Sequence, residues 1–541
     1  MNGYAASKWT LSHEEKLLLI EERSMSDVES ESGRMDLDQR FPAQQWLSTA
    51  KSYGKAFRIS ALTSVVIRSA IFLLPSFLHP SRNSRERLRG GDKLGPTAYL
   101  DGMRGLAALF VFFCHYFYTS FVIAEGWGHN DANYHFWKLP FVRLLFSGPS
   151  MVCIFFIISG YALSLKPLKQ IRGRSFEGLL NTIASFIFRR GFRLFLPTAA
   201  STFMVVCLLQ LGAYEGTRDF AYDSNYVRNV AEHHPILQDT FSEQFLHWAG
   251  EMFNFLHFWG WEKFGGSTGY DVHLWTIPVE YRCSMVLFLA LIGLARLRTG
   301  ARFACIAILM WFMLHNDRWE PLLFLVGTVL AELDIIRGAH SNAGPASSSA
   351  GSAPASLLPF EEKESSSSSR PCKCRKAQGL AYVLLSVPAL YLMSEPDAGP
   401  DGVPGWETLG ALIPEYFSDR YRFWQMVGGA LFVFCVARAP LWQRVFTTGP
   451  VQYLGRLSFA IYLMHGPVTH TLGYRVQRWA WTSVTGADTE AAFRSGAILA
   501  AAINIPTVFW AADIFARAVD APIVRFTRWL ETRVSITAEQ H

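Results

Sequence analysis

Charged residues are scarce in this chain. They make up 17% of its 541 residues, whereas soluble domains average about 25%. Half of the residues are hydrophobic and 14% are aromatic, a balance that indicates a membrane protein. The net charge of +6 is spread over many loops, so no block of like charge indicates a nucleic-acid partner. The eight cysteines show no disulfide framework.

The N-terminal region lacks an apolar run. Its first fifty residues are polar and mixed in charge, so we expect no cleavable signal peptide, and the first membrane segment would act as its own insertion signal. Six cysteines lie in or beside apolar segments, where cysteine behaves as a small buried hydrophobe. Cys372 and Cys374 lie in a basic stretch, for which a plain linker is a simpler interpretation than metal binding or lipidation.

Long apolar runs recur along the chain. A membrane-spanning helix needs roughly 20 apolar residues, and ten runs, three of them shorter than this, are candidate spans: 100–124, 146–166, 187–212, 274–295, 302–315, 319–337, 377–393, 423–437, 450–473 and 495–519. The predicted fold class is an all-α polytopic membrane protein, a bundle of about ten transmembrane helices. The stretch 57–79 is apolar but contains Arg58, Arg68 and Pro75. It predicts an interfacial amphipathic helix, with an eleventh span as the alternative.

Lysine and arginine are distributed unevenly between the loops. Ten alternating spans place four basic segments on one side, namely 82–93, 166–193, 296–302 and 438–444. The opposite side receives the long segment 213–272, which has nine acidic residues against three basic ones. Because basic loops stay in the cytoplasm, we expect both termini there, in an endomembrane or the plasma membrane.

Composition divides the chain into six segments. Residues 338–376 are rich in Ser, Ala, Gly and Pro, which predicts a disordered cytoplasmic linker. The linker splits a membrane core into 97–337, with helices one to six, and 377–519, with helices seven to ten. Outside the core we expect a disordered region 1–56, the interfacial helix and linker 57–96, and a cytoplasmic tail 520–541. No internal repeat of the kind found in transporters is visible.

The first predicted span carries three ionisable residues, Asp101, Arg104 and His115. An ionisable group in hydrocarbon costs roughly 2.5–3.5 kcal/mol, so its presence indicates a functional site. Arg104 and His115 are eleven residues apart, so on an α-helix both project from one face, roughly 16 Å apart along the axis. Asp101 lies three residues before Arg104 and can pair with it. We therefore expect Arg104 and His115 to lie at the two ends of one reaction site.

Two further segments combine charge with a membrane helix. Three arginines, Arg189, Arg190 and Arg193, lie at the expected cytoplasmic mouth of the third span. They suit phosphate groups through bidentate contacts, although the positive-inside rule alone also places arginines there. His273 and Glu280 are seven residues apart, close to two helical turns, and can share a face.

Two more features have a simpler structural interpretation beside a functional one. The Ser159-Gly160 pair permits close helix approach and on its own is best explained by packing. His465 lies about two-thirds of the way across its predicted span, and a lone histidine there is more often a hydrogen-bonded packing residue. Four such features in one chain favour a functional site.

Leaving the arginine group aside, the other four features form motifs in a fixed order. They are Asp101-Gly-Met-Arg-Gly-Leu-Ala-Ala with His115, Phe155-Phe-Ile-Ile-Ser-Gly160, His273-Leu-Trp-Thr-Ile-Pro-Val-Glu280 and Gly455-Arg-Leu-Ser-Phe-Ala-Ile-Tyr-Leu-Met-His465. From about residue 97 to 519 the chain resembles the acyltransferase 3 family of integral membrane acyltransferases, whose Arg-x10-His motif is matched by Arg104 and His115. Where bacterial relatives commonly have Asp, this chain has Cys153, so it looks like a fungal-type member, some of which serve natural-product pathways.

The resemblance implies a ten-helix enzyme that moves an acyl group, most often acetyl, from coenzyme A to a hydroxyl acceptor. We expect His115 to be the general base, because imidazole titrates near neutral pH, or to carry the acyl group covalently. Glu280, or less readily His273, would orient His115 or the acceptor. Arg104, held by Asp101, would steer the donor.

The remaining site residues are expected in supporting roles. Arg189, Arg190 and Arg193 would bind the phosphates of the donor, while Trp275 and His465 would support the site. We expect no metal and no bound cofactor; acyl-CoA, in particular acetyl-CoA, is a co-substrate. The expected partners are a carbohydrate or natural-product acceptor and the lipid bilayer, with no nucleic acid.

Two alternatives differ in class from this interpretation. A polytopic transporter or flippase could use buried Arg, His and Glu as a proton or substrate path, although the inverted halves expected of it are not visible. A catalytically inactive scaffold of the same fold is disfavoured because Arg104, His115 and Glu280 are all present.

Overall fold

The computed structural model describes residues 71–79, 94–260, 266–339 and 372–535. These residues form helices and turns without a β-strand; one isolated bridge joins Thr268 and Asp271. The predicted disordered segment 1–56 lies outside the described residues, as do 57–70 and 80–93 of the predicted segment 57–96 and most of the 338–376 linker.

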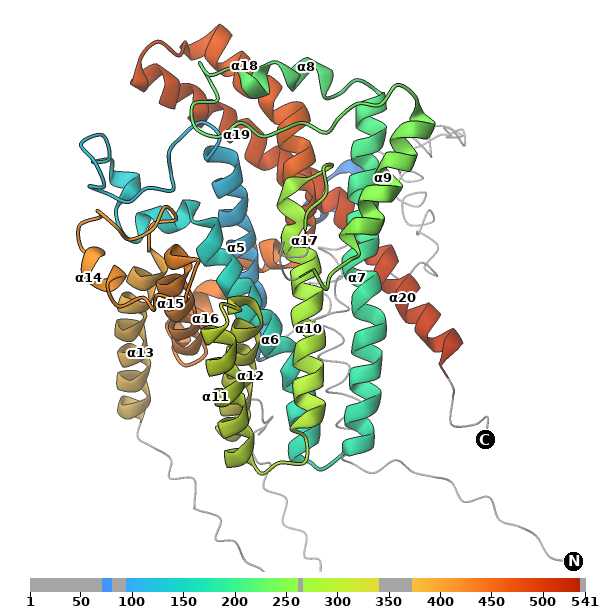
Figure 1. Cartoon of the computed structure of the whole chain (residues 1–541), viewed down its shortest axis with the longest axis vertical. Helices are drawn as coiled ribbons and strands as arrows, with labels where there is room; N and C mark the ends of the chain where they lie inside the picture. Colours follow the sequence, from blue (N-terminus) through green and yellow to red (C-terminus); the bar gives the residue numbers. More distant parts are fainter. Residues whose placement is uncertain (1–70, 80–93, 261–265, 340–371, 536–541) are drawn as a thin grey trace, which may run out of the picture.

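Long helices run roughly along one direction and form a bundle (Figure 1). The principal helices are α5 (Ala98–Phe117), α6 (Gly148–Arg172), α7 (Phe176–Gln210), α9 (Phe241–Phe255), α10 (Thr276–Gly293), α11 (Thr299–His315), α12 (Trp319–Ile336), α13 (Cys372–Met393), α15 (Arg420–Val436), α16 (Pro440–Phe446), α17 (Gly449–Val468), α18 (Tyr474–Trp479), α19 (Glu490–Phe515) and α20 (Ala521–Val534). Shorter elements are η1 (Ser76–Leu78), η2 (Phe136–Lys138), η3 (Val142–Phe146), α8 (Glu215–Arg218), η4 (Phe220–Tyr222), η6 (Val272–Trp275), α14 (Glu407–Gly410), η7 (Thr469–Gly473), η8 (Ala480–Thr485) and η9 (Ala516–Asp520). The all-helical fold class is confirmed.

Within the part of the chain that the structure describes, four helices are long and apolar enough to cross a membrane: Gly148–Arg172, Phe176–Gln210, Val272–Gly293 and Glu490–Val534. A bent pair, α15 with α16, would add a fifth. The count of ten is therefore not reached and stays a prediction. Helix α12 shows one reason, because its 18 residues include Glu320, Glu332 and Asp334, which interrupt an apolar span.

The carboxylates of α12 are paired inside the bundle. Arg282 of α10 lies 3.3 Å from Glu320, and Arg438 lies 3.1 Å from Asp334. Arg302 of α11 donates hydrogen bonds to Glu332. Charges in a membrane helix normally face the bundle interior and have partners, and these residues follow that rule.

Glycines permit the closest helix contacts. A Cβ added to Gly160 of α6 would lie 2.2 Å from the carbonyl oxygen of Phe324 in α12, so the predicted close approach at Ser159-Gly160 is confirmed. A Cβ on Gly105 of α5 would lie 2.3 Å from the amide nitrogen of Gly455 in α17. Small residues at helix crossings let backbones approach in this way. The contact between α5 and α17 brings two of the sequence motifs together.

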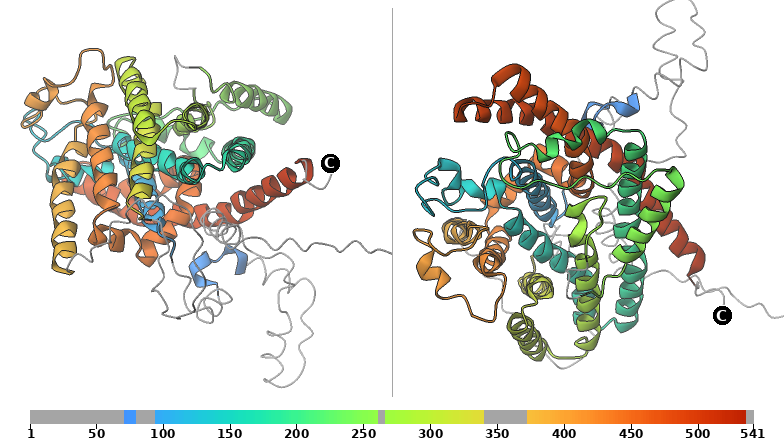
Figure 2. Two further views of the ribbon diagram at one scale, coloured as in Figure 1. Left: turned by 90° about the horizontal axis from the view of Figure 1, so that it is seen from below. Right: turned by 45° about the horizontal axis from the view of Figure 1, so that its top comes forward.

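The two ends of the bundle differ (Figures 1 and 2). The turns between α6 and α7 and between α10 and α11 lie at one end, whereas α8, α9 and α18 gather at the other. The basic segments 166–175 and 296–298 thus lie opposite most of the acidic segment 213–260, as the loop charges predict. We call the end with α8 and α18 the loop end.

The ends of the chain's described part also pack on the bundle. The backbone carbonyls of Phe72 and Leu74 accept hydrogen bonds from Arg517 at 2.7 and 2.9 Å. The predicted tail begins with helix α20, where Glu531 lies 3.3 Å from Arg189 of α7. Part of each flanking segment therefore contacts the core.

Candidate functional site

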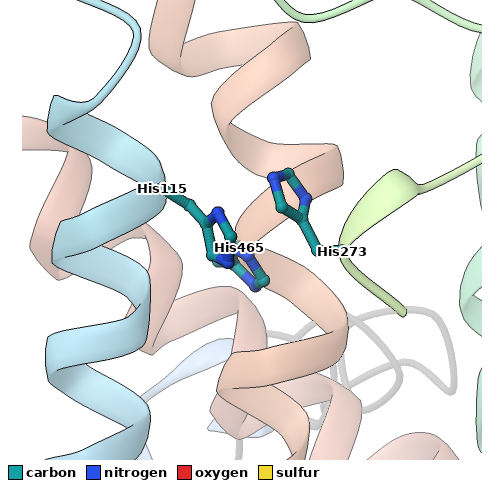
Figure 3. A group of neighbouring side chains, drawn as sticks. All are labelled: His115, His273 and His465. Atoms are coloured by element: carbon teal, nitrogen blue, oxygen red, sulfur yellow. The ribbon is translucent and has the colours of Figure 1, made fainter. Parts of the chain in front are cut away.

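Three of the predicted site residues meet near the loop end of the bundle. His115 comes from α5, His273 from η6 and His465 from α17 (Figure 3). The ring centroids of His115 and His273 are 4.0 Å apart, those of His115 and His465 are 5.3 Å apart, and those of His273 and His465 are 4.9 Å apart. We call these three residues the histidine cluster.

The register of α5 against α17 explains why two of the rings meet. The two helices run in parallel, with Gly105 beside Gly455 at one crossing and the ring of Phe112 6.1 Å from that of His465 further along. His115 and His465 each lie ten residues beyond these glycines. Because the rise per residue is the same in both helices, the two rings lie at the same depth in the bundle.

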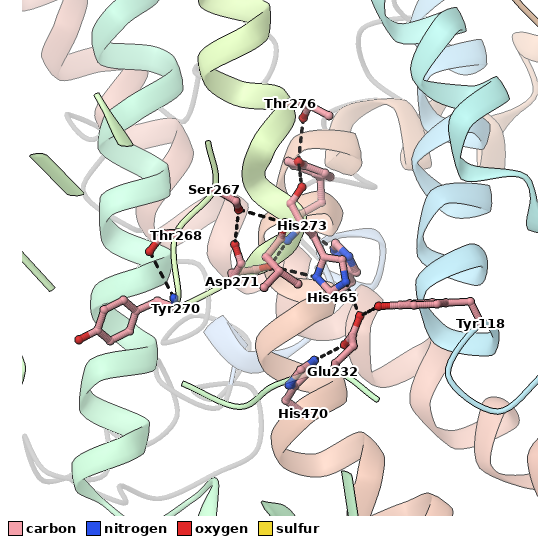
Figure 4. A network of polar contacts seen from close by, with 12 residues as sticks. Tyr118, Glu232, Ser267, Thr268, Tyr270, Asp271, His273, Thr276, His465 and His470 are labelled. Atoms are coloured by element: carbon pink, nitrogen blue, oxygen red, sulfur yellow. Dashed lines mark hydrogen bonds and ion pairs between the residues drawn. The ribbon is translucent and has the colours of Figure 1, made fainter. Parts of the chain in front are cut away.

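His273 is held between two carboxylates (Figure 4). Its Nδ1 lies 3.0 Å from Asp271 Oδ1, and its Nε2 lies 2.7 Å from Glu232 Oε1. Asp271 also accepts the backbone N–H of His273 at 3.0 Å and so caps η6. A ring nitrogen can hydrogen-bond to a carboxylate only by donating a proton. Two such contacts fit the imidazolium form of His273.

His465 has a different environment from His273. Its Nδ1 lies 2.7 Å from the carbonyl oxygen of Tyr462, which only accepts hydrogen bonds, so Nδ1 carries the proton. Its Nε2 is buried and has no hydrogen-bond partner among the described residues. No hydrogen bond to the ring of His115 is found among those residues either, so these two rings have nitrogens available for a substrate.

Glu232 lies in the segment between α8 and α9 and was not predicted as a site residue. It accepts hydrogen bonds from Tyr118 and from His470 Nε2, the latter at 2.5 Å, besides its contact with His273. Burial alone raises the pKa of this carboxyl, but the imidazoles of His273 and His470 outweigh it and hold the pKa well below its usual range. In the sequence, only its position next to His233-His234 distinguishes it.

One ring nitrogen from each residue of the histidine cluster lies within 4.8 Å of the other two, and zinc accepts imidazole nitrogen as a ligand. A metal ion needs a nitrogen lone pair, however, and both nitrogens of His273 face carboxylates. The arrangement therefore fits a group of acid–base residues and does not fit a three-histidine ligand set.

Glu280 lies in a different polar group from His115. Its Oε1 is 2.7 Å from Arg190 Nη2 and 2.9 Å from Ser159 Oγ. Its described hydrogen bonds thus join α10 to α7 and α6, and none joins it to the histidine cluster. Trp275 packs against the apolar core formed with α6 and α12.

The predicted donor-binding arginines are accompanied by carboxylates. Arg104 Nη2 lies 3.6 Å from Asp101, which confirms their expected pairing, and Arg104 Nε donates to Ser458 Oγ at 3.1 Å. Arg189 and Arg190 pair with Glu531 and Glu280, respectively. The charges of Arg193 and Arg104 both act on Asp520. Positive charge is therefore concentrated on one flank of the bundle and partly neutralised there.

The fold and the cluster define a class of protein: an integral membrane protein with a polar acid–base centre inside a helical bundle. The chain belongs to the acyltransferase 3 family, because the acyltransferase domain of that family matches residues 97–329 and 373–516. It is thus an enzyme that transfers acyl groups, and this replaces the transporter interpretation.

Three fungal proteins are similar to most of the chain. The O-acetyltransferase PaAT-1 of Phomopsis amygdali is 33% identical over 86% of this chain and 90% of its own length. Acyltransferase clz18 of Cochliobolus lunatus is 25% identical over 82% of this chain and 97% of its own. Acyltransferase R4 of a Phoma species is 25% identical over 79% and 94%. No solved structure matches the chain.

Proposed function

We propose that this enzyme transfers an acetyl group from acetyl-CoA to a hydroxyl group of a carbohydrate or natural-product acceptor. The observation that carries the proposal is the meeting of His115, His273 and His465, which three separate motifs supply. The name of the relative PaAT-1, an O-acetyltransferase, supports acetyl as the group and oxygen as the acceptor atom.

In the proposed reaction His115 acts as general base. It removes the proton of the acceptor hydroxyl while the oxygen attacks the thioester carbonyl carbon; the carbon–sulfur bond breaks, and His115 returns the proton to the sulfur of coenzyme A. No cofactor is consumed, and acetyl-CoA is a co-substrate. His115 suits the role because its ring lies in the cluster without a described hydrogen bond that would occupy its nitrogens.

We place the phosphate-bearing end of the donor near Arg104. This side chain is 44% exposed, so a ligand can reach it, and it lies on α5 roughly 16 Å along the helix from His115. The extended pantetheine arm of the donor would bridge the two positions along α5. Arg189 and Arg193 would assist, with Glu531 and Asp520 competing for their charge.

The test is acetyl-CoA turnover by the purified, detergent-solubilised protein, followed as free coenzyme A with a panel of hydroxylated acceptors. His115→Ala should lower kcat by about 10²–10⁴-fold, the usual contribution of a general base. His233→Ala is the matched control, because His233 is an exposed loop histidine that contacts Tyr222. Unchanged turnover in His115→Ala would overturn the proposed mechanism. If no acetyl-CoA is consumed, its assignment as the donor is wrong.

A further inference from the structure

Glu232 joins parts of the chain that are distant in sequence. It is 5% exposed and contacts Tyr118 after α5, His273 in η6 and His470 in η7, which are 114, 41 and 238 residues away. A buried carboxylate is costly unless it is paired and hydrogen-bonded. The three donors around Glu232 meet that condition, so an ionised Glu232 is stable at this position.

We propose that Glu232 is a positioning residue that, together with Asp271, holds His273 as an imidazolium beside His115. The proposal rests on the proposed function, because it gives His273 a task in the reaction at His115. Glu232 and Asp271 fix the ring of His273 at both nitrogens, so the ring cannot rotate without losing a charge-assisted hydrogen bond.

The groups that face His273 support a positive charge on this residue. Two carboxylates, Glu232 and Asp271, contact it directly, while the rings of His115 and His465 lie 4.0 and 4.9 Å away and that of His470 lies 6.5 Å away. Glu232 also contacts His470, so its charge is shared between two imidazoles. Asp271 contacts the other ring nitrogen of His273, 3.0 Å from Nδ1.

A fixed positive charge next to His115 has a chemical use. Attack on a thioester places negative charge on the carbonyl oxygen, and a preorganised charge in a water-poor site stabilises it without reorganisation. Because the nitrogens of His273 are engaged, it would act through its field and would not donate a hydrogen bond to the substrate. Glu232 thereby acts on the reaction through His273.

Glu232→Gln should lower kcat by about 10²-fold with little change in the KM for acetyl-CoA. The pH profile is the readout that a purely structural role would not change. The variant should lose activity toward alkaline pH, as His273 loses its proton, in a range where the wild type keeps its activity. Glu232→Asp should restore the wild-type alkaline limb, and Asp239→Asn is the control, because Asp239 is an exposed acid of the same loop.

A second readout does not depend on turnover. Nitrogen-15 spectra of histidine-labelled protein at neutral pH should show an imidazolium signal that disappears in both His273→Gln and Glu232→Gln. This separates the two proposals, because loss of the signal in Glu232→Gln supports the positioning role even where His115→Ala retains turnover. A wild-type pH profile in Glu232→Gln, or an imidazolium signal that survives in it, would overturn the inference.

Discussion

At the scale of the single residue, the two available histidines differ in how firmly they are held. His465 is fixed by its Nδ1 contact with Tyr462 and keeps its buried Nε2 without a partner, whereas no described hydrogen bond orients the ring of His115. A base is usually oriented by a second group, so the geometry alone leaves His465 as a competitor for the role. Mutation can distinguish the two.

His465→Asn tests this difference. The asparagine amide can still donate to the carbonyl of Tyr462, but the nitrogen that faces the cluster is lost. We expect kcat to fall about tenfold, well short of the 10²–10⁴-fold loss expected of a general base in His115→Ala. The measurement is the kcat of both variants at saturating acetyl-CoA. A larger loss in His465→Asn than in His115→Ala would assign the base to His465.

His234 makes the loop end sensitive to acid. It is 5% exposed and its ring nitrogens have no hydrogen-bond partner among the described residues. Burial, followed by the charges of His470 and Arg218, lowers its pKa from 6.5 to about 3. A lowered histidine pKa means that the unfolded chain binds the proton more readily, so stability is full above pH 6.5 and falls as the pH drops toward 3.

At pH 5 the lowered pKa of His234 reduces the free energy of unfolding by about 2 kcal/mol. Glu232 has a pKa below its usual 4.5, so it reduces the free energy of unfolding only at lower pH. His234→Phe should therefore reduce the drop in thermal unfolding midpoint between pH 7 and pH 5. His233→Phe, on the exposed neighbour, should leave the drop unchanged. An equal drop in wild type and His234→Phe would contradict the assignment.

At the scale of the helix, the close contact of α5 with α17 sets the register of the cluster. A Cβ on Gly105 would lie 2.3 Å from a backbone nitrogen that cannot move aside. Gly105→Ala should therefore cost about 1–3 kcal/mol, as overpacking does, and should lower both the thermal midpoint and kcat. Gly250→Ala in α9 is the control, because a Cβ there meets nothing within 4 Å. A stable, fully active Gly105→Ala would show that the helices can separate without affecting the site.

Helix boundaries also explain which sequence predictions succeeded. The motifs contain His115, His273 and His465, whose rings the fold brings together, and two of the basic stretches, 166–175 and 296–298, lie at the end opposite most of the acidic segment (Figure 1). The expected sharing of a face by His273 and Glu280 was based on a continuous α-helix, but His273 lies in the 3-10 turn η6 and α10 begins at Thr276. Their seven-residue spacing therefore does not bring them together, and Glu280 contacts Arg190.

Tertiary contacts account for the rest. Glu232 carries no motif, and its partners are up to 238 residues away, so no local pattern could identify it. The arginines were expected at the mouth of a span that begins at 187, and α7 begins earlier, at Phe176, so they lie well inside this helix. The carboxylates that accompany them come from α10, η9 and α20, and this pairing depends on the packed structure.

At the scale of the whole molecule, charge is divided between its surfaces and its interior. The basic stretches 166–175 and 296–298 lie at one end and most of the acidic segment 213–260 lies toward the loop end (Figure 1), while α12 keeps its carboxylates paired with buried arginines. The paired charges lower the mean hydropathy of helices that pack in the centre of the bundle. For this reason, only some of the helices in the bundle are apolar enough to count as candidate spans. The crossing of each helix is therefore best tested directly.

Helix α10, part of the candidate span Val272–Gly293, separates two exposed positions suited to such a test, Asp239 before it and Arg298 after it. With cysteine at each position in turn, an impermeant maleimide applied to sealed vesicles should label one variant, and the other only after permeabilisation, with the parent protein as background. Because the basic segment is expected on the cytoplasmic side, Arg298→Cys should be the variant labelled from the cytoplasm. Labelling of both from the same side would mean that α10 does not cross the membrane.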